Sequence, residues 1–354
     1  NYKYMKKVAI LIITALLFQS LNAQKIETVI QRSSAGECKV MTISGDGMLI
    51  AKVNQNQTTE IEIWNTKTRH LVRTINTGES SNFGEQFLKS ITQLHFWKGS
   101  KFLVTGTFDG VHEVFDVETG KKTKSLCSQS YLEGVSAVSE KTGTFAAIHP
   151  LDFSRSSILF FDLFNNIVYD SVRLNIGAIS AITFSPDGEK MIVGTDEGSF
   201  HIIEMTTYNR TMQADKAHPS KITYLQWTPD NYLLVNDSSM FTLWNMAQGQ
   251  MISNGKTGKG ARVVTSPSED CFFIADANGI RKKPGGGMEQ KRFGIKPDMV
   301  NKLSFANNRL FALTDNFVRV FDLNSVSQAA CESYSTYLAE PLKKKTRDRW
   351  LNTF

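Results

Sequence analysis

The sequence is poor in cysteine and proline, with 4 Cys and 8 Pro among its 354 residues. So few cysteines exclude a small scaffold built on disulfides, and no C-x-x-C pair of the zinc or thioredoxin type is present. The sequence leaves open whether Cys38, Cys127, Cys271 and Cys331 pair or stay free. Neither charge dominates, since 40 Lys and Arg face 34 Asp and Glu, and 41% of the residues are hydrophobic. This composition excludes a wholly disordered, collagen-like or multi-pass membrane protein.

The N-terminal segment has the layout of an export signal. Lys6 and Lys7 precede an apolar run of 11 residues, Val8 to Phe18, and small and polar residues follow it. A helix needs about 20 apolar residues to cross a bilayer, so the run is too short for a stable membrane anchor. We therefore expect residues 1–23 to be a signal peptide cleaved after Ala23, which implies a periplasmic or secreted protein. The alternative is a buried core helix.

Positive charge is concentrated at the two ends of the chain. Residues 1–23 hold three lysines, and residues 343–349 hold five basic groups and one acid. The body between these ends is nearly neutral, so no nucleic-acid-binding face is predicted. The C-terminal basic run is expected to be a solvated tail, and the alternative is contact with an acidic surface or an anionic lipid.

A short motif recurs along the chain, mostly at intervals of 41 to 51 residues. It consists of an apolar residue, an aromatic or large apolar residue, and then Asp, Asn or Glu before a turn. Its copies are Ile63-Trp64-Asn65, Val114-Phe115-Asp116, Phe160-Phe161-Asp162, Ile202-Ile203-Glu204, Leu243-Trp244-Asn245 and Val320-Phe321-Asp322. The last interval is nearly two periods long, which predicts a degenerate copy near residues 280–283.

An alternating apolar strand, a turn and a second strand precede each copy of the motif. The clearest example runs through Ile179–Phe184, Ser185-Pro186-Asp187-Gly188 and Lys190–Gly194. Alternation with a period of two predicts strands with one buried face, and Pro-Asp-Gly favours a tight turn because Pro presets φ and Gly adopts positive φ. Strand starts near residues 37, 92, 135, 179, 221, 262 and 300 predict seven units of about 40 residues.

With these units the chain resembles the WD-repeat β-propellers, specifically a secreted bacterial type. The resemblance covers about residues 25–325 and implies an all-β fold, a seven-bladed β-propeller of four-stranded antiparallel blades. The repeat residues that carry it are Trp64, Phe115, Asp116, Phe161, Asp162, Trp244, Phe321 and Asp322. The Gly-His dipeptide common in the family is absent, which puts in doubt the Asp-His-Ser/Thr-Trp hydrogen-bonded tetrad found in many such blades.

Both ends of the repeat region are expected to share one blade. Residues 26–31 have strand composition, whereas the last unit lacks a good fourth strand after Asn324. Because an open ring would leave unpaired edge strands, residues 25–32 are predicted to complete the seventh blade. The predicted domains are a signal peptide over 1–23, the propeller over 24–325, and a short C-terminal helix and basic tail over 326–354.

No motif predicts catalysis or a cofactor. Gly255-Lys256-Thr257 lacks the glycine that a phosphate-binding loop needs five residues earlier, where Gln250 stands. Gly285-Gly286-Gly287 lacks the strand and helix of a dinucleotide fingerprint. No G-x-S-x-G or H-E-x-x-H motif is present. The histidines show no metal-ligand spacing and are expected on the surface or in loops: His70, His95, His112, His149, His201 and His218.

The resemblance also implies a binding face. In WD-repeat propellers, the loops between the second and third strands of each blade and the links between blades share one face that commonly binds proteins. On this chain that face would display Phe83, Phe87, Phe108, Asp109, His149, Asp152, Phe153, Arg155, Asp196, Glu197 and Asp237. Aromatic and Arg side chains anchor interfaces because they bury a large area at a modest entropy cost. The alternative for Phe83 and Phe87 is that they only hold their own loop in place.

These features predict a non-catalytic platform that binds another protein in the periplasm or outside the cell. Two alternatives stay open. One is a propeller hydrolase or lactonase with a metal ion in the central channel, bound by Asp, Asn, Glu or His from the inner strands. The other is a sensor or regulatory subunit of a secreted protease or an envelope assembly.

Overall fold

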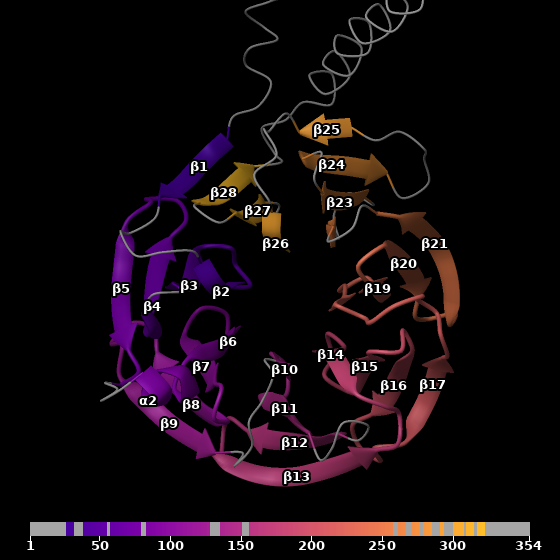
Figure 1. Ribbon diagram of the computed structural model, residues 1–354, viewed down its shortest axis with the longest axis horizontal. Coiled ribbons are helices and arrows are strands. Elements are labelled where there is room, and N and C mark those ends of the chain that lie inside the picture. The colour runs from indigo at the N-terminus through magenta and orange to yellow at the C-terminus, as the bar shows by residue number, and fades with distance from the viewer. Residues whose placement is uncertain are drawn as a thin grey trace, which may run out of the picture.

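The computed structural model describes residues 26–31, 38–54, 57–78, 83–127, 135–150, 156–257, 261–266, 271–276, 279–284, 291–293, 300–307, 309–314 and 317–322. Within these ranges the chain forms seven antiparallel sheets of four strands, placed around a central axis (Figure 1). The prediction of an all-β propeller with four-stranded antiparallel blades is confirmed. The predicted signal peptide, C-terminal helix and basic tail lie outside the described residues.

Six sheets are each built from four consecutive strands, running from the innermost to the outermost (Figure 1). The first three contain β2 (Cys38–Ile43), β3 (Leu49–Asn54), β4 (Gln57–Asn65), β5 (Leu71–Asn76), β6 (Ile91–Trp97), β7 (Phe102–Thr107), β8 (Val111–Asp116), β9 (Lys122–Cys127), β10 (Ser136–Val138), β11 (Thr144–Pro150), β12 (Ser156–Asp162) and β13 (Ile167–Leu174). The next three contain β14 (Ile179–Phe184), β15 (Lys190–Thr195), β16 (Phe200–Glu204), β17 (Arg210–Ala214), β18 (Tyr224–Trp227), β19 (Tyr232–Asn236), β20 (Met240–Asn245), β21 (Gln250–Lys256), β22 (Arg262–Ser266), β23 (Cys271–Asp276), β24 (Gly279–Pro284) and β25 (Lys291–Phe293). The innermost strands begin within three residues of the predicted unit starts.

The remaining sheet combines strands from the two ends of the described chain. It contains β26 (Val300–Ala306), β27 (Arg309–Thr314), β28 (Phe317–Asp322) and, on the outside, β1 (Ile26–Gln31). β1 pairs antiparallel with β28, with Ile26 opposite Phe321 and Gln31 opposite Phe317. This pairing confirms the prediction that the strand before the first unit completes the last one.

The core lies between sheets rather than inside any one of them. Each hydrophobic cluster of the described residues joins two neighbouring sheets. In one, Ile63 and Ile75 pack with Ile91 and Leu103, and in another Met41 and Ile50 pack with Phe311 and Val320. The second of these clusters closes the circle, because it joins the β2–β5 sheet to the sheet that contains both ends of the chain.

The recurring motif forms the turn between the third and fourth strands. In five sheets the register shifts between the aromatic or large apolar residue and the residue before it, which is the mark of a β-bulge. The acid or amide that follows then caps the turn: Asn65 Oδ1 accepts hydrogen bonds from the N–H groups of Lys67 and Thr68, both at 2.9 Å. Asp116, Asp162 and Asn245 make equivalent bonds. The motif therefore encodes a bulge followed by a capped turn.

The Ser-x-Asp-Gly turns explain the second sequence signal. Ser185 Oγ donates to Asp187 Oδ1 at 2.5 Å, and the same oxygen accepts from the Glu189 N–H at 2.9 Å. Gly188 takes a φ of +75°, which an L side chain adopts only at a cost. Ser44 and Asp46 repeat this arrangement in the β2–β3 turn.

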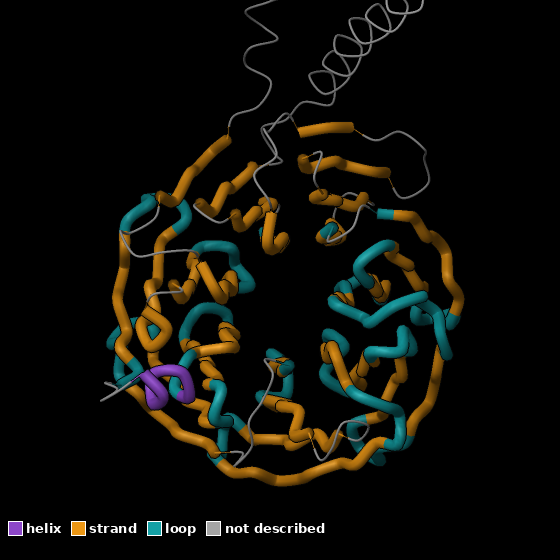
Figure 2. The backbone as a smooth tube through the Cα atoms, viewed as in Figure 1, coloured by secondary structure: helices purple, strands orange, loops and turns teal. Residues whose placement is uncertain are grey.

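One short helix, α2 (Phe83–Leu88), lies in the long link between β5 and β6 (Figure 2). Among the described residues, no helix has both the length and the apolar character that a bilayer crossing requires.

Removing β1 tests the closure of the ring. A chain that begins at Arg32 should melt roughly 10 °C below a chain that begins at Gln24, because the loss of β1 leaves the edge of β28 unpaired. Thermal unfolding followed by circular dichroism measures the difference. Equal melting temperatures for the two chains would show that the β1–β28 pairing contributes nothing to stability.

Candidate partner-binding face

Two kinds of loop meet at one end of the sheets and form what we call the loop face. They are the turns between the second and third strands of each sheet and the links between successive sheets. Backbone hydrogen bonds join them: the N–H of Phe108 donates to Ser90 O at 3.0 Å, that of Asp109 to Leu88 O at 3.0 Å, and that of Asp196 to Ala178 O at 3.0 Å. The described loops of this face are therefore fixed to each other.

Phe87 and Phe108 form an aromatic pair on the loop face, in which Phe87 is exposed and Phe108 is half-buried. Phe87 comes from α2 and Phe108 from the β7–β8 turn, and their ring centroids are 4.8 Å apart. Phe87 remains 53% exposed despite this contact. The pair thus fixes α2 to its neighbouring turn and still presents apolar surface to solvent, so the two alternatives predicted for Phe87 are compatible.

Acidic side chains flank two turns of the same face. Asp109 accepts a hydrogen bond from the hydroxyl group of Thr107. Asp196 and Glu197, in the β15–β16 turn, are exposed. This turn depends on Gly198, which has a φ of +83° and whose added Cβ would lie 2.0 Å from His218 O. The link that carries His218 therefore packs directly against the acidic turn.

Asp237 does not belong to the exposed face on which the sequence predicted it, because its side chain is fully buried. Its Oδ1 accepts the N–H groups of Ser239 and Met240 at 2.6 and 2.7 Å, which caps the β19–β20 turn. Burial opposes ionisation, but these N–H groups hold the pKa of Asp237 below its ordinary value. Its other oxygen lies 3.5 Å from His218 Nδ1.

His218 links Asp237 to a buried polar chain. His218 Nε2 lies 2.9 Å from Thr242 Oγ1, and Trp244 Nε1 donates to the same hydroxyl at 2.9 Å. Burial lowers the pKa of His218, although Asp237 opposes this effect, so the imidazole is neutral near pH 7. Hydrogen bonds join Trp244, Thr242 and His218, and Asp237 lies 3.5 Å from His218 Nδ1, so these four residues occupy the positions of the tetrad that the missing Gly-His dipeptide had put in doubt. The informative signal was Ala217-His218 at the end of a link, followed by Asp237 and then Thr242-x-Trp244.

Two histidines predicted to lie on the surface or in loops are instead buried in strands, His112 in β8 and His201 in β16. His218 lies in a link between sheets, as that prediction allowed, but its side chain is buried. Burial also lowers the pKa of His112 to about 4 and that of the partly buried His95 to about 3, where Lys302 and His112 add repulsion. Among the described residues, no three His, Cys, Asp or Glu side chains are grouped so that they could hold a metal ion.

The rest of the predicted face is only partly visible. Asp152, Phe153 and Arg155, in the β11–β12 loop, lie outside the described residues. His149 lies in β11 and Phe83 begins α2, and the side chains of both are outside the described part of the structure. The structure therefore brings together Phe87, Phe108 and Asp109, and places Asp196 and Glu197 on a separate turn of the same face.

Relatives of the chain include WD-repeat proteins. No known protein-family profile matches. The chain is 23% identical over 242 residues to the transcriptional corepressor LEUNIG_HOMOLOG of Arabidopsis thaliana, a match covering 67% of this chain and 28% of that protein. It is 23% identical over 162 residues to the WD repeat-containing protein 26 homolog of Drosophila melanogaster, covering 40% of this chain and 24% of that protein. The chain thus spans about a quarter of the length of these curated relatives.

Solved structures share the fold at low sequence identity. A chain of the Mitotic Checkpoint Complex superposes with a TM-score of 0.68 at 13% identity, covering 84% of this chain and 91% of that chain. The β-propeller domain of Cps50 (Swd1) from Myceliophteria thermophila superposes with a TM-score of 0.67 at 16% identity, covering 84% of this chain and 99% of that domain. Together with the WD-repeat relatives, these similarities support a WD-repeat β-propeller.

The tetrad is tested by Thr242→Val, which preserves shape but removes the hydroxyl. We expect a loss of about 3 kcal/mol in the free energy of unfolding, because the buried Nε2 of His218 and the partly buried Nε1 of Trp244 both lose their partner. Denaturant unfolding measures it, with Thr74→Val at an exposed position of β5 as the matched control. The double variant Thr242→Val, Trp244→Phe should lose less free energy of unfolding than the two single variants lose in total, because Trp244→Phe has already removed the indole N–H. Full additivity would contradict a shared hydrogen-bond chain.

Proposed function

We propose that the chain is a non-catalytic interaction platform, a seven-bladed WD-repeat propeller whose loop face binds another polypeptide. The observation that carries this proposal is the pair formed by Phe87 and Phe108. It is an exposed aromatic surface held in place by the backbone bonds between the β7–β8 turn and the β5–β6 link. A preorganised aromatic group can be buried by a partner at little further entropy cost.

The charge of the loop face indicates the character of the partner. Asp109 lies next to the aromatic pair, and Asp196 and Glu197 are exposed on a turn of the same face. A partner that combines apolar side chains with Lys or Arg would complement this surface, and the charges would act mainly on its rate of association. The relatives give the proposal a context, since one is named as a transcriptional corepressor and one fold neighbour belongs to a multiprotein complex.

Partner capture tests the loop face. The double variant Phe87→Ala, Phe108→Ala should retain less than a tenth of the partner that the unchanged protein captures by crosslinking in an extract of its source cells, because both rings of the pair are lost. Phe164→Ala is the matched control: Phe164 is 49% exposed but lies in the β12–β13 turn, at the opposite end of its sheet. Circular dichroism confirms folding of each variant. Equal capture by the double variant and the unchanged protein would exclude this surface.

We also propose export to the periplasm or beyond the cell, on the strength of Lys6, Lys7 and the short apolar run that follows them. The expected product of expression in a bacterial host is a protein in the periplasmic or culture fraction that begins at Gln24. N-terminal sequencing of that fraction measures it. A cytoplasmic product that retains residues 1–23 would contradict the proposal.

A further inference from the structure

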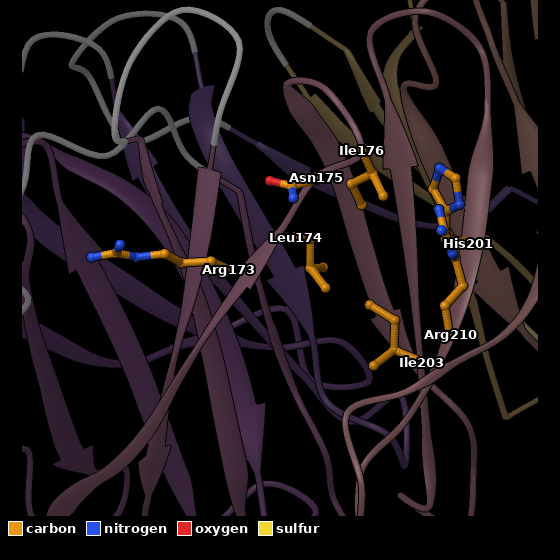
Figure 3. A pocket seen from close by; sticks show the side chains of 7 residues that line it. All are labelled: Arg173, Leu174, Asn175, Ile176, His201, Ile203 and Arg210. Carbon is orange, nitrogen blue, oxygen red and sulfur yellow. The ribbon is translucent and has the colours of Figure 1, made fainter.

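A cavity of about 230 Å³ opens between the β10–β13 and β14–β17 sheets (Figure 3). Its apolar wall is formed by Leu174, the last residue of β13, by Ile176 two residues further on, and by Ile203 of β16. These three residues also belong to the hydrophobic cluster between the two sheets. The cavity is therefore a place where the core between two sheets is left unfilled.

The opposite wall of the cavity is polar and positively charged. His201 is only 4% exposed, and its Nδ1 has no hydrogen-bond partner. Figure 3 shows the guanidinium group of Arg210 next to the His201 ring. Arg173 also lines the cavity, but its guanidinium group extends away from the other lining side chains. The Arg210 side chain makes no ion pair or hydrogen bond with any residue that the structure describes. A buried nitrogen without a hydrogen-bond partner is costly, and when Nδ1 carries the ring proton, a ligand that accepts a hydrogen bond removes that cost.

The β6–β9 sheet, two sheets away around the ring, shows which group is missing. In the β6–β9 sheet, Phe115 pairs with Lys122, and Glu113 lies two residues before Phe115. In the β14–β17 sheet, Ile203 pairs with Arg210 in the same way, with His201 in the position of Glu113. Lys122 Nζ forms a 2.7 Å ion pair with Glu113. The β14–β17 sheet thus has the cation of this pair but not its carboxylate.

The charge in the cavity favours a singly charged ligand. Burial and the adjacent Arg210 lower the pKa of His201, and Asp215 opposes this effect. The imidazole is therefore neutral near pH 7, and the full positive charge beside it is that of Arg210, an exposed residue. One guanidinium and one neutral ring N–H match a carboxylate better than a doubly charged phosphate.

We propose that this cavity binds the C-terminal carboxylate and the apolar side chain of the last residue of a partner polypeptide. Arg210 pairs with the carboxylate, His201 donates a hydrogen bond to it, and the apolar side chain packs on Leu174, Ile176 and Ile203. The inference rests on the proposed function, because its occupant is a segment of a protein partner. It adds a second recognition site, separate from the aromatic pair of the loop face.

The test uses a short peptide, N-acetyl-Gly-Gly-Leu, with either a free carboxylate or a C-terminal amide. Isothermal titration with the full chain should give at least tenfold tighter binding of the acid. Arg210→Gln should abolish this preference, whereas Arg173→Gln, which removes the same charge from a side chain pointing away, should change the affinity less than twofold. Equal binding of acid and amide to the unchanged protein would overturn the proposal, and that result does not depend on capture through Phe87 and Phe108.

In a second variant, a side chain of the protein provides the carboxylate that the ligand would otherwise supply. His201→Glu recreates the Glu113–Lys122 arrangement, so it should pair with Arg210, raise the melting temperature and reduce peptide binding at least tenfold. Peptide binding that survives His201→Glu would overturn the proposal even if Arg210→Gln failed to fold. Two further results would overturn the proposal. Tighter binding of methyl phosphate than of the peptide acid would favour a phosphate ligand, and tighter binding of isocaproate than of the peptide acid would favour a small metabolite.

Discussion

Mutual burial between neighbouring sheets is the constraint on which the structure depends. Each cluster of buried side chains in the described chain is shared by two sheets, so a single sheet removed from the ring would expose apolar residues on both faces. The ring closes through the cluster shared by the β2–β5 sheet and the last sheet, in which β1 pairs with β28 from the other end of the repeat region. Loops at the ends of the sheets contribute few side chains to these clusters, so their sequences can vary.

The repeated frame could be predicted from sequence because it is local. Period-two alternation marks the strands, and the acid or amide after each motif aromatic caps a turn that spans only a few residues. The position of β1 beside β28 could also be predicted from the sequence, because an unpaired edge strand in the last sheet is unfavourable. The β24 strand lies where the degenerate motif copy was expected, near residues 280–283.

The site residues were harder to predict because their roles depend on contacts between segments. Asp237 has the composition of an exposed loop residue, yet His218, 19 positions earlier, brings it into a buried chain. These four positions require the imidazole of His218 but not the glycine that usually precedes that histidine, so the absence of Gly-His did not exclude them. The cavity beside His201 was not predictable either, since it exists only where two sheets fail to fill the space between Leu174 and Ile203.

One strand position accounts for much of the chemistry of this ring. Two residues before the motif aromatic or apolar residue stand Glu62, Glu113, His201 and Thr242 in four different sheets. Glu62 pairs with Lys52 at 2.9 Å and accepts from Trp64 at 2.8 Å, and Thr242 joins Trp244 to His218. At this position a polar side chain is buried beside the turn and must find a partner. The sheets of Glu62, Glu113 and Thr242 supply that partner internally. His201 keeps an unpaired nitrogen beside an unpaired cation, and this difference from its equivalents makes the β14–β17 sheet the one suited to recognise a group from outside.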